Sequence, residues 1–397
     1  MLGGDKFLSF AYGVGWCCAL VFAGNARGDQ SAPGPVLNPL DGSARVYGAA
    51  TCSSTGCHGG ADDRSRQYIV WSQRDVHSRA FATLATARAA RMAEALQLND
   101  PAVEPRCIVC HAPLRTVAPE QLAADARVSE GVSCISCHGP ADTWLRSHTR
   151  SDYSHAERVA AGMRDLRDLR GRANSCVACH QNIEPDLIIV GRHPTLLFEL
   201  DGQAQVEPKH WREFAGFNGA QAWFVGQAVA WREMSWALLH GTTDVARDTP
   251  RWQALRWLLQ RTGLDYDLPA LRQLPAESTP AAMDNVIKLA DQLAQRAAQT
   301  WRPEQTSAVL ARLAATTDDF RPDGETNRVL ACRAERLVIA LHRLLAALPS
   351  ERRPSGASAQ LDKLFGLAQS QEDFAPTDFA HEVAAFARVL ELPASQK

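Results

Sequence analysis

The chain has 397 residues and a formal net charge of −2, from 42 Lys and Arg against 44 Asp and Glu. This balance argues against a nucleic-acid-binding protein, which usually carries an excess of positive charge to meet phosphates. Hydrophobic residues make up 46% of the chain, which is enough to bury a core. The length fits one large domain or two ordinary ones.

The first thirty residues have the pattern of a secretory signal peptide. A lysine precedes the apolar run FLSFAYGVGWCCALVFAG, and the small residues Gly24 and Ala26 stand where a cut after Ala26 requires them. A membrane anchor is the alternative, although this run barely spans a bilayer. The residues before the two adjacent cysteines do not form a lipobox. We therefore expect residues 1–26 to be a cleaved signal peptide and the mature protein to be periplasmic.

Eight later cysteines form four pairs, and a histidine follows each pair directly. Three pairs have the motif Cys-x-x-Cys-His: CIVCH at 107–111, CISCH at 134–138 and CVACH at 176–180. The motif is typical of covalently bound haem c, because two thiols form thioethers to the haem vinyl groups and the histidine ligates the iron. The sequence predicts four haem c groups bound by Cys52, Cys57, Cys107, Cys110, Cys134, Cys137, Cys176 and Cys179, with His58, His111, His138 and His180 as proximal iron ligands.

The first pair, CSSTGCH at 52–58, has four residues between its cysteines instead of two. We interpret it as a fourth haem site whose longer spacer loops outward, with Gly56 supplying backbone freedom. A Cys52–Cys57 disulfide is the alternative for this pair.

For the set of pairs as a whole, zinc and disulfides are the competing interpretations. Neither explains why a histidine follows every pair, and zinc needs reduced thiols in an oxidising compartment. The remaining cysteine, Cys332, is expected to be a small core residue.

Histidine is the expected second axial ligand of most irons, because most of the other histidines lie in the same half as the motifs and methionines are few. The candidates are His77, His148, His193 and His210. His77 lies in a stretch, residues 70–98, that predicts one long helix. His193 follows a run of β-branched residues that predicts an extended segment ending in a turn.

The other histidines are expected to have different roles. His155 competes with His148, but its polar surroundings suit a solvated helix start. His240 directly precedes a glycine and is expected to cap a helix. His342 and His381 are expected to be ordinary surface or helix residues.

Several stretches follow one another over residues 47–211 in a familiar order: YGAATCSSTGCHGG, WSQRDVHSRAF, RCIVCHAP, GVSCISCHGPADTWLRSH, NSCVACHQN, GRHPTLLFEL and PKHW. Together they resemble the multihaem cytochrome c-554/c-prime family. The resemblance implies a periplasmic, mostly helical tetrahaem electron carrier with closely stacked haems and mostly bis-histidine iron. The family's distal histidines match His77, His148, His193 and His210.

This chain departs from the family pattern just before His193, the third distal candidate. Pro185 stands where related sequences often have a histidine, and Arg192 intrudes between Gly191 and His193. The departure leaves open that one haem lacks its sixth ligand or takes another such as His155. A five-coordinate iron would permit substrate chemistry.

From about residue 246 the chain has no further Cys-x-x-Cys-His motif, and its proline and glycine positions predict where helices begin and end. One is expected from Thr249-Pro250 to Gly263 and another from Thr279-Pro280. Two apolar stripes at helical spacing predict two more, Leu330, Ala334, Leu337, Leu341, Leu344 and Leu348 before Pro349, and Phe379, Val383, Phe386 and Leu390 before Pro393. An all-α bundle is expected.

The predicted fold is mostly α: a multihaem cytochrome c domain with little regular strand over residues 27–245, followed by an all-α helical bundle over residues 246–397. The expected function is electron transfer between redox proteins, either other cytochromes or membrane quinol-linked complexes, and the helical half is a candidate surface for a partner. No nucleic acid is expected, and no catalytic set of residues is evident. The alternative is an oxidoreductase acting on a small nitrogen or sulfur compound at one five-coordinate haem.

Overall fold

The computed structural model describes residues 44–266, 268–273, 280–322 and 324–391, so the predicted signal peptide lies outside the described residues. Within these ranges the fold is helical and has no β-strand, only an isolated bridge between Val46 and Leu122. This confirms the mostly α prediction. The first half contains α1 (Gln67–Arg74), α2 (Ala80–Thr83), α3 (Ala87–Ala95), α4 (Pro105–His111), α5 (Cys134–His138), α6 (His155–Ala160), α7 (Leu169–His180), α8 (Pro185–Ile189) and α9 (Leu200–Val206).

The single helix predicted for residues 70–98 is wrong, because the chain breaks at Asp75. This residue is extended, with φ −78° and ψ 128°, and it ends α1. Its carboxylate accepts a hydrogen bond from the backbone N–H of His77 and so begins a short 3-10 helix, Val76–Arg79. The break turns His77 away from the direction of α1.

The segment before His193 also differs from its prediction. Residues Pro185–Ile189 form the short helix α8 instead of an extended strand, with Pro185 in its first turn. The chain then turns through Arg192, whose φ of 59° is left-handed, and continues without regular structure to the start of α9. The turn after the apolar run was correctly predicted, but the isoleucines of that run lie in or next to the helix rather than in an extended segment.

The second half contains α10 (Gly219–Leu239), α11 (Val245–Thr262), α12 (Pro269–Arg272), α13 (Pro280–Gln299), α14 (Pro303–Ala314), α15 (Asn327–Ala347), α16 (Ala357–Ala368) and α17 (Pro376–Glu391). The predicted start of α11 at Thr249 is wrong, because Asp244 caps the helix five residues earlier by accepting from the N–H of Arg247. Pro250 therefore lies inside the helix, and Gly263 ends it as predicted.

The two predicted apolar stripes form the buried faces of α15 and α17. Leu337, Leu341 and Leu344 on α15 are fully buried, as are Phe379 and Phe386 on α17. Cys332 is buried on α15, as expected for a core residue. The helices α14 and α16 were not predicted, and they pack against α15.

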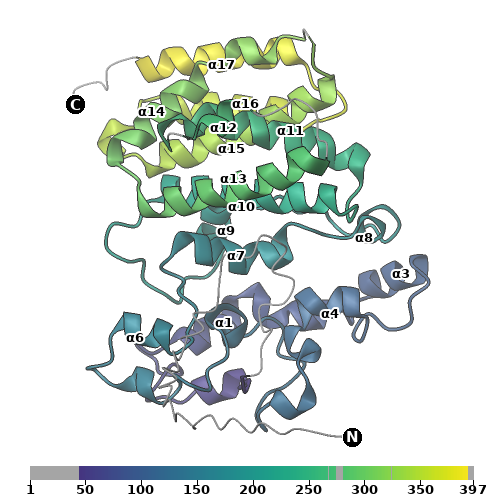
Figure 1. Ribbon diagram of the computed structural model, residues 1–397, viewed down its shortest axis with the longest axis vertical. Helices are drawn as coiled ribbons and strands as arrows, with labels where there is room; N and C mark the ends of the chain where they lie inside the picture. The colour runs from purple at the N-terminus through teal and green to yellow at the C-terminus, as the bar shows by residue number, and fades with distance from the viewer. Residues whose placement is uncertain (1–43, 267, 274–279, 323, 392–397) are drawn as a thin grey trace, which may run out of the picture. The chain divides into compact units, whose positions relative to one another are not determined.

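One apolar core extends from α7 to α17 and includes residues on both sides of position 245. Its centre is α10, whose tryptophans Trp223 and Trp231 are fully buried. This helix lies alongside α13 and also contacts α7, α9, α11 and α15 (Figure 1). The domain boundary at 245 stays a prediction, since the helix that ends just before it packs extensively with the helices that follow.

A buried charge network fastens α7 to this core. The Asp291 carboxylate on α13 accepts hydrogen bonds from Arg170 of α7 at 2.8 Å and from Arg232 of α10 at 2.7 Å. Arg232 is 1% exposed and also donates to Asn174 of α7. Because α7 ends in the motif CVACH, this network fixes the position of the fourth motif.

Replacing Asp291 with alanine should destabilise the fold strongly. It leaves the Arg170 guanidinium without its carboxylate in a site with little access to water, and breaking such a pair costs about 3–5 kcal/mol. The free energy of unfolding, measured by denaturant titration of the haem-loaded protein, should fall by that amount. Asp284→Ala is the matched control on the same helix, since Asp284 pairs with Lys288 on the exposed surface. Equal losses in the two variants would contradict this account.

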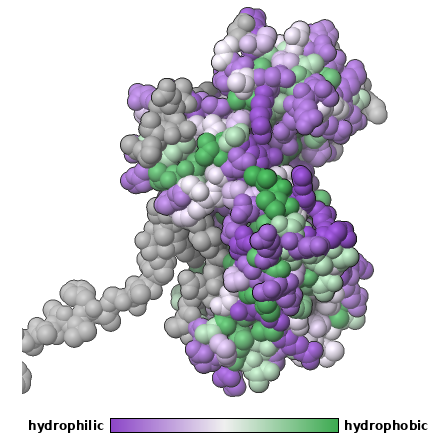
Figure 2. Space-filling model, turned by 90° about the vertical axis from the view of Figure 1, so that its right-hand side faces the viewer, coloured by the Kyte–Doolittle hydropathy of each residue, from purple (hydrophilic) through white to green (hydrophobic). Residues whose placement is uncertain are grey.

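The surface is mostly polar, and on the face shown in Figure 2 apolar residues form separate patches. Several large apolar side chains are exposed close in sequence to candidate histidines: Val76 before His77, Ile189 and Val190 before His193, and Val206 before His210. None of the described helices has both the length and the apolarity needed to cross a membrane.

Candidate haem-binding site

Each Cys-x-x-Cys-His motif lies at the end of a helix, and its histidine is the last helical residue. The motif CIVCH ends α4, CISCH forms α5 and CVACH ends α7. On a helix, residues three and four apart lie on one face. The two thiols and the imidazole of each motif therefore point to the same side, as two thioethers and one iron bond to a single porphyrin require.

The first motif reaches a similar arrangement with its longer spacer. A 3-10 helix, Ala49–Cys52, brings the chain to the first cysteine, and the spacer residues 54–56 are exposed. The N–H of His58 donates to the carbonyl of Cys52 at 3.2 Å, so the loop closes and returns the histidine to its first cysteine. This agrees with a spacer that loops outward, and the structure holds Cys52 and Cys57 as free thiols.

The glycine predicted to permit this loop is not the one that matters. Gly56 is absent from the positive-φ residues and has open space around its Cα, so a side chain would fit there. The close approaches come after the motif: a Cβ on Gly59 would lie 1.8 Å from the carbonyl oxygen of Ser53, and one on Gly60 would lie 2.1 Å from Ser65 Oγ.

Three of the four proximal histidines face a predicted distal histidine. The ring centres of His58 and His148 are 6.2 Å apart, those of His77 and His180 are 6.0 Å apart, and those of His111 and His193 are 6.4 Å apart. Each pair joins one motif histidine to one histidine from a distant segment.

These separations fit two imidazoles on opposite sides of one iron. A histidine nitrogen lies about 2 Å from the metal that it binds, and the ring centre lies about 1 Å beyond, so two opposed rings have centres about 6 Å apart. Direct contact between two rings would give shorter separations for stacked faces. The spacing therefore leaves room for a metal between the rings in each of the three pairs.

The hydrogen bonds of these histidines leave the correct nitrogen free. In five of them Nδ1 lies within hydrogen-bonding distance of an accepting oxygen, and so donates its proton to it: Gln67 Oε1 for His58, Asp75 Oδ1 for His77, and the backbone oxygens of Ala80, Leu145 and Pro194 for His111, His148 and His193. Metal-binding histidines usually donate their second N–H in this way. Nε2 is left as the atom available to iron.

Burial keeps two proximal imidazoles neutral, as metal binding requires. Desolvation lowers the pKa of His180 to about 4. Burial, followed by the nearby charge of His210, lowers the pKa of His138 to about 4. At neutral pH both rings thus keep a lone pair for a metal.

His138 and His210, the proximal and distal candidates left over, differ from the three pairs. Within the described residues no ring contact joins the two, although the charge of His210 contributes to the lowered pKa of His138. The His210 ring packs edge-on against Trp211 at 5.1 Å. Its side chain also lies close to Asp75 and Glu207, with one ligand atom of each within 4.8 Å of the others. The site around His138 is therefore the least completed of the four.

The remaining histidines lie outside these pairs. His155 begins α6, as expected for a solvated helix start, and its Nε2 is hydrogen-bonded to Asp165 Oδ1 at 2.9 Å, so the nitrogen needed for iron is occupied. His240 caps the end of α10 and stacks on Trp236. His342 and His381 are exposed on α15 and α17.

Cysteines of different motifs approach one another in three places. The Cys52 thiol is hydrogen-bonded to Cys134, and Cys110 to Cys179. Burial raises the pKa of Cys176 to about 12, with the next contribution from the charge of Cys137. These contacts link the first motif to the third, the third to the fourth, and the fourth to the second.

A cavity of about 370 Å³ is lined by the candidate ligand His210 and by Gln67, the hydrogen-bond partner of His58. Its other walls carry four cationic side chains and one acidic one: Arg64, Arg66, Lys209 and Arg212 against Asp63. A haem has an apolar ring and two carboxylates. The exposed apolar residues beside the distal histidines suit the ring, and the basic rim suits the carboxylates.

Sequence reasoning missed Asp75 as a functional residue. Its carboxylate is buried and accepts from Nδ1 of His77 at 3.0 Å. A carboxylate in this position raises the basicity of the ligand and thereby favours the oxidised metal. The only sequence signal was an acidic residue two positions before a candidate ligand.

If His180 and His77 ligate one haem, Asp75→Asn should therefore raise the midpoint potential of that haem. The asparagine oxygen can still cap the 3-10 helix and accept from Nδ1, but without the negative charge. Spectroelectrochemical titration would show one of the haem potentials moving upward and the others staying in place. Asp165→Asn, which removes the carboxylate beside His155, is the control. An unchanged set of potentials in Asp75→Asn would show that Asp75 does not tune this ligand.

Residues 51–139 match the family of proteins described as cytochrome c554 and c-prime. This range contains the first three motifs and His77. No curated protein and no solved structure matches the chain.

Proposed function

We propose that this chain is a periplasmic tetrahaem c-type cytochrome that transfers electrons between redox proteins, as the match of residues 51–139 to the cytochrome c554 and c-prime family suggests. The family supports a c-type cytochrome with a redox role. The number of haems, their ligands and the compartment are parts of the proposal. The observation that carries it is the spacing of the three imidazole pairs, 6.0 to 6.4 Å between ring centres.

The residues that would hold the four haems follow from the motifs and the pairs. The eight motif cysteines supply the thioethers. The axial ligand pairs are His58 with His148, His111 with His193 and His180 with His77, and His138 takes His210 as its candidate. Bound haem supplies reversible one-electron chemistry, and bis-histidine ligation favours lower potentials than histidine–methionine ligation.

The positions of the motifs would determine which haems lie next to one another. The cysteine contacts support the spatial order first, third, fourth, second for the motifs. The Cys52 site and the Cys107 site are then the two ends, where redox partners would dock. Other cytochromes or membrane quinol-linked complexes are the proposed partners.

Haem stoichiometry and spin state test this proposal. We expect the mature protein to contain four haem irons per chain and to show low-spin spectra from at least the three sites whose imidazoles are paired. Pyridine haemochrome absorbance with metal analysis gives the first quantity, and electron paramagnetic resonance gives the second. Colourless protein, or zinc in place of iron, would overturn the proposal.

One observation favours a second candidate function at the third site, an oxidoreductase acting on a small nitrogen or sulfur compound. His210 is the one distal candidate without ring contact to its proximal histidine, and it lines the cavity with four cationic residues. An iron held by His138 alone would have an open position next to a basic cavity, and that environment suits an anionic substrate.

Ligand binding separates the two functions. A high-spin signal from one of the four haems, together with binding of nitric oxide or cyanide to the oxidised or reduced protein, would support substrate chemistry at the third site. Four low-spin irons that bind neither ligand would support electron transfer and rule out substrate chemistry at this site.

A further inference from the structure

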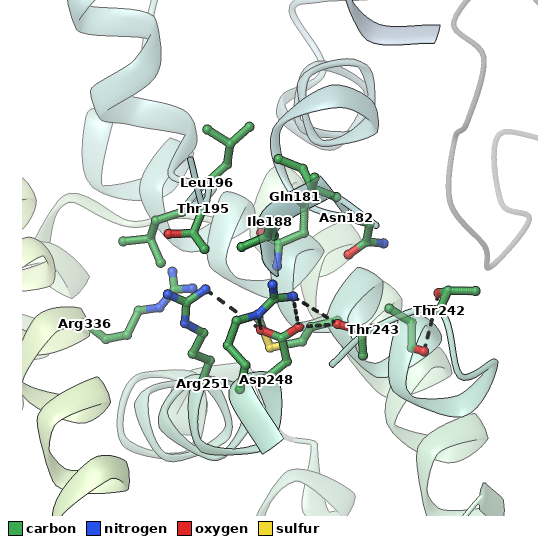
Figure 3. A pocket seen from close by; sticks show the side chains of 15 residues that line it. Gln181, Asn182, Ile188, Thr195, Leu196, Thr242, Thr243, Asp248, Arg251 and Arg336 are labelled. Atoms are coloured by element: carbon green, nitrogen blue, oxygen red, sulfur yellow. Dashed lines mark hydrogen bonds and ion pairs between the residues drawn. The ribbon is translucent and has the colours of Figure 1, made fainter. Parts of the chain in front are cut away.

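We propose that a pocket between the helical bundle and the segments that follow His180 and His193 binds one small monovalent anion. Its floor is formed by α11 and α15, and its other walls come from residues 181–183 and 195–197 (Figure 3). The pocket contains none of the motif cysteines or candidate axial histidines, so it is separate from the haem sites.

The size of the pocket limits what it can hold. Its enclosed volume is about 20 Å³. A cavity needs about 10–15 Å³ to hold a water molecule. The pocket therefore suits a halide or a small oxyanion and excludes a nucleotide or a sugar.

A buried guanidinium that is hydrogen-bonded to no carboxylate among the described residues gives the pocket its selectivity, although the charges of Glu335 and Glu199 act on it from nearby. Arg336 of α15 is 3% exposed, and its Nη1 donates to the neutral Gln227 Oε1 at 2.9 Å. Its Nη2 has no hydrogen-bond partner in the described structure. Glu335, the next residue, is bonded to Gln371 instead. Leaving such a group unpaired is costly, and a bound anion removes the cost.

A second arginine turns toward the same point. Figure 3 shows the guanidinium groups of Arg251 and Arg336 close together beside Thr195. Their like charges interact, and burial is the main reason that the pKa of Arg336 falls to about 10, which still leaves it charged at neutral pH. Two facing guanidinium groups present parallel N–H donors that match an anion between them.

The one carboxylate in the pocket does not neutralise this pair. Asp248 accepts from Arg247 Nε at 2.8 Å and also binds Arg247 Nη2 and the Thr243 hydroxyl. Arg251 reaches it only at 3.9 Å. Asp248 thus mainly balances Arg247 and is shared with Arg251, so the three arginines that line the pocket outnumber its one carboxylate.

Apolar side chains close the other side of the pocket. Ile188 and Leu196 lie opposite the guanidinium groups in Figure 3, and Met234 also lines the space. An anion there would be shielded from water, which strengthens its attraction to both arginines. It would also connect the bundle to the two segments that carry His180 and His193.

Bromide is the probe for this site. Crystals of the haem-loaded protein soaked in bromide should show an anomalous scattering peak between the guanidinium groups of Arg251 and Arg336. In solution, chloride or nitrate should raise the Tm of the wild-type protein at constant ionic strength, relative to a salt whose large anion cannot enter the pocket.

Two substitutions and one control complete the test. Arg251→Gln and Arg336→Gln should each abolish the bromide peak and the anion-dependent rise in Tm, whereas Arg328→Gln, at the exposed start of α15, should keep both. Arg251 lies nearer the surface than Arg336, so the test stands even if Arg336→Gln does not fold. No bromide peak in the wild-type protein, or a peak that persists in Arg251→Gln, would overturn the proposal.

Discussion

Replacing His148 with alanine is expected to convert one low-spin haem into a high-spin, five-coordinate haem that binds cyanide or nitric oxide. His148 is the predicted distal ligand of the haem at the first motif, with its ring centre 6.2 Å from that of His58. Alanine removes the axial nitrogen and leaves a space beside the buried Trp144. Because axial ligation governs spin state and reactivity, about a quarter of the iron should change its spectrum.

The control for this substitution lies seven residues away. His155→Ala removes a half-buried histidine from the same segment, but one whose Nε2 is held by Asp165. Its spectrum should match the wild type. Electron paramagnetic resonance of the oxidised proteins, with cyanide titration, distinguishes the two variants. If His155→Ala produced the high-spin signal and His148→Ala did not, the assignment of the distal ligand would be reversed.

The chemistry of the motifs could be predicted from sequence because it is local. Two thiols and an imidazole within five residues reach one porphyrin whatever the rest of the chain does, and a single helical turn puts them on one face. The same is true of the apolar stripes of α15 and α17, which follow from helical spacing alone. His240, placed before a glycine, likewise proved to end α10.

The pairing of histidines could not be predicted, since it depends on contacts between distant segments. The sequence named His77 as a distal candidate without assigning it to a motif, and the fold brings it to His180 of the fourth. The cause is the break at Asp75, which a helical pattern over residues 70–98 does not reveal. Where an acidic side chain caps a new turn, local capping outweighs the continuing apolar period.

The bundle shows the same limit in its connections. Proline after threonine suggested a start for α11 at Thr249, but Asp244 offered an earlier cap and the helix accommodates Pro250. Buried charges such as Arg232 and Arg336 could not be recognised in the sequence, because a charged residue gives no sign of burial until its partners are known. Those residues nevertheless connect the bundle to the motif-bearing α7 and create the proposed anion pocket.

Replacing both Cys52 and Cys57 with serine is expected to lower the haem content from four per chain to three. The two thiols are the only thioether donors of the first motif, and serine hydroxyls do not add to vinyl groups under the same conditions. Intact-mass measurement of the mature, denatured protein counts the haems that remain covalently attached. The proximal His58 keeps its place through its N–H bond to residue 52, so the loss reflects the missing thiols rather than a displaced ligand.

The matched control is Cys332→Ser, which removes a buried cysteine that belongs to no motif and should keep all four haems. A result of four attached haems in the double variant would mean that the four-residue spacer does not form a haem site and that the porphyrins bind elsewhere. The geometry of the spacer is the reason to expect a haem at this motif. His58 and Cys52 are brought together by a backbone hydrogen bond although four residues separate the cysteines, and this closed loop is what allows an irregular motif to act like the three regular ones.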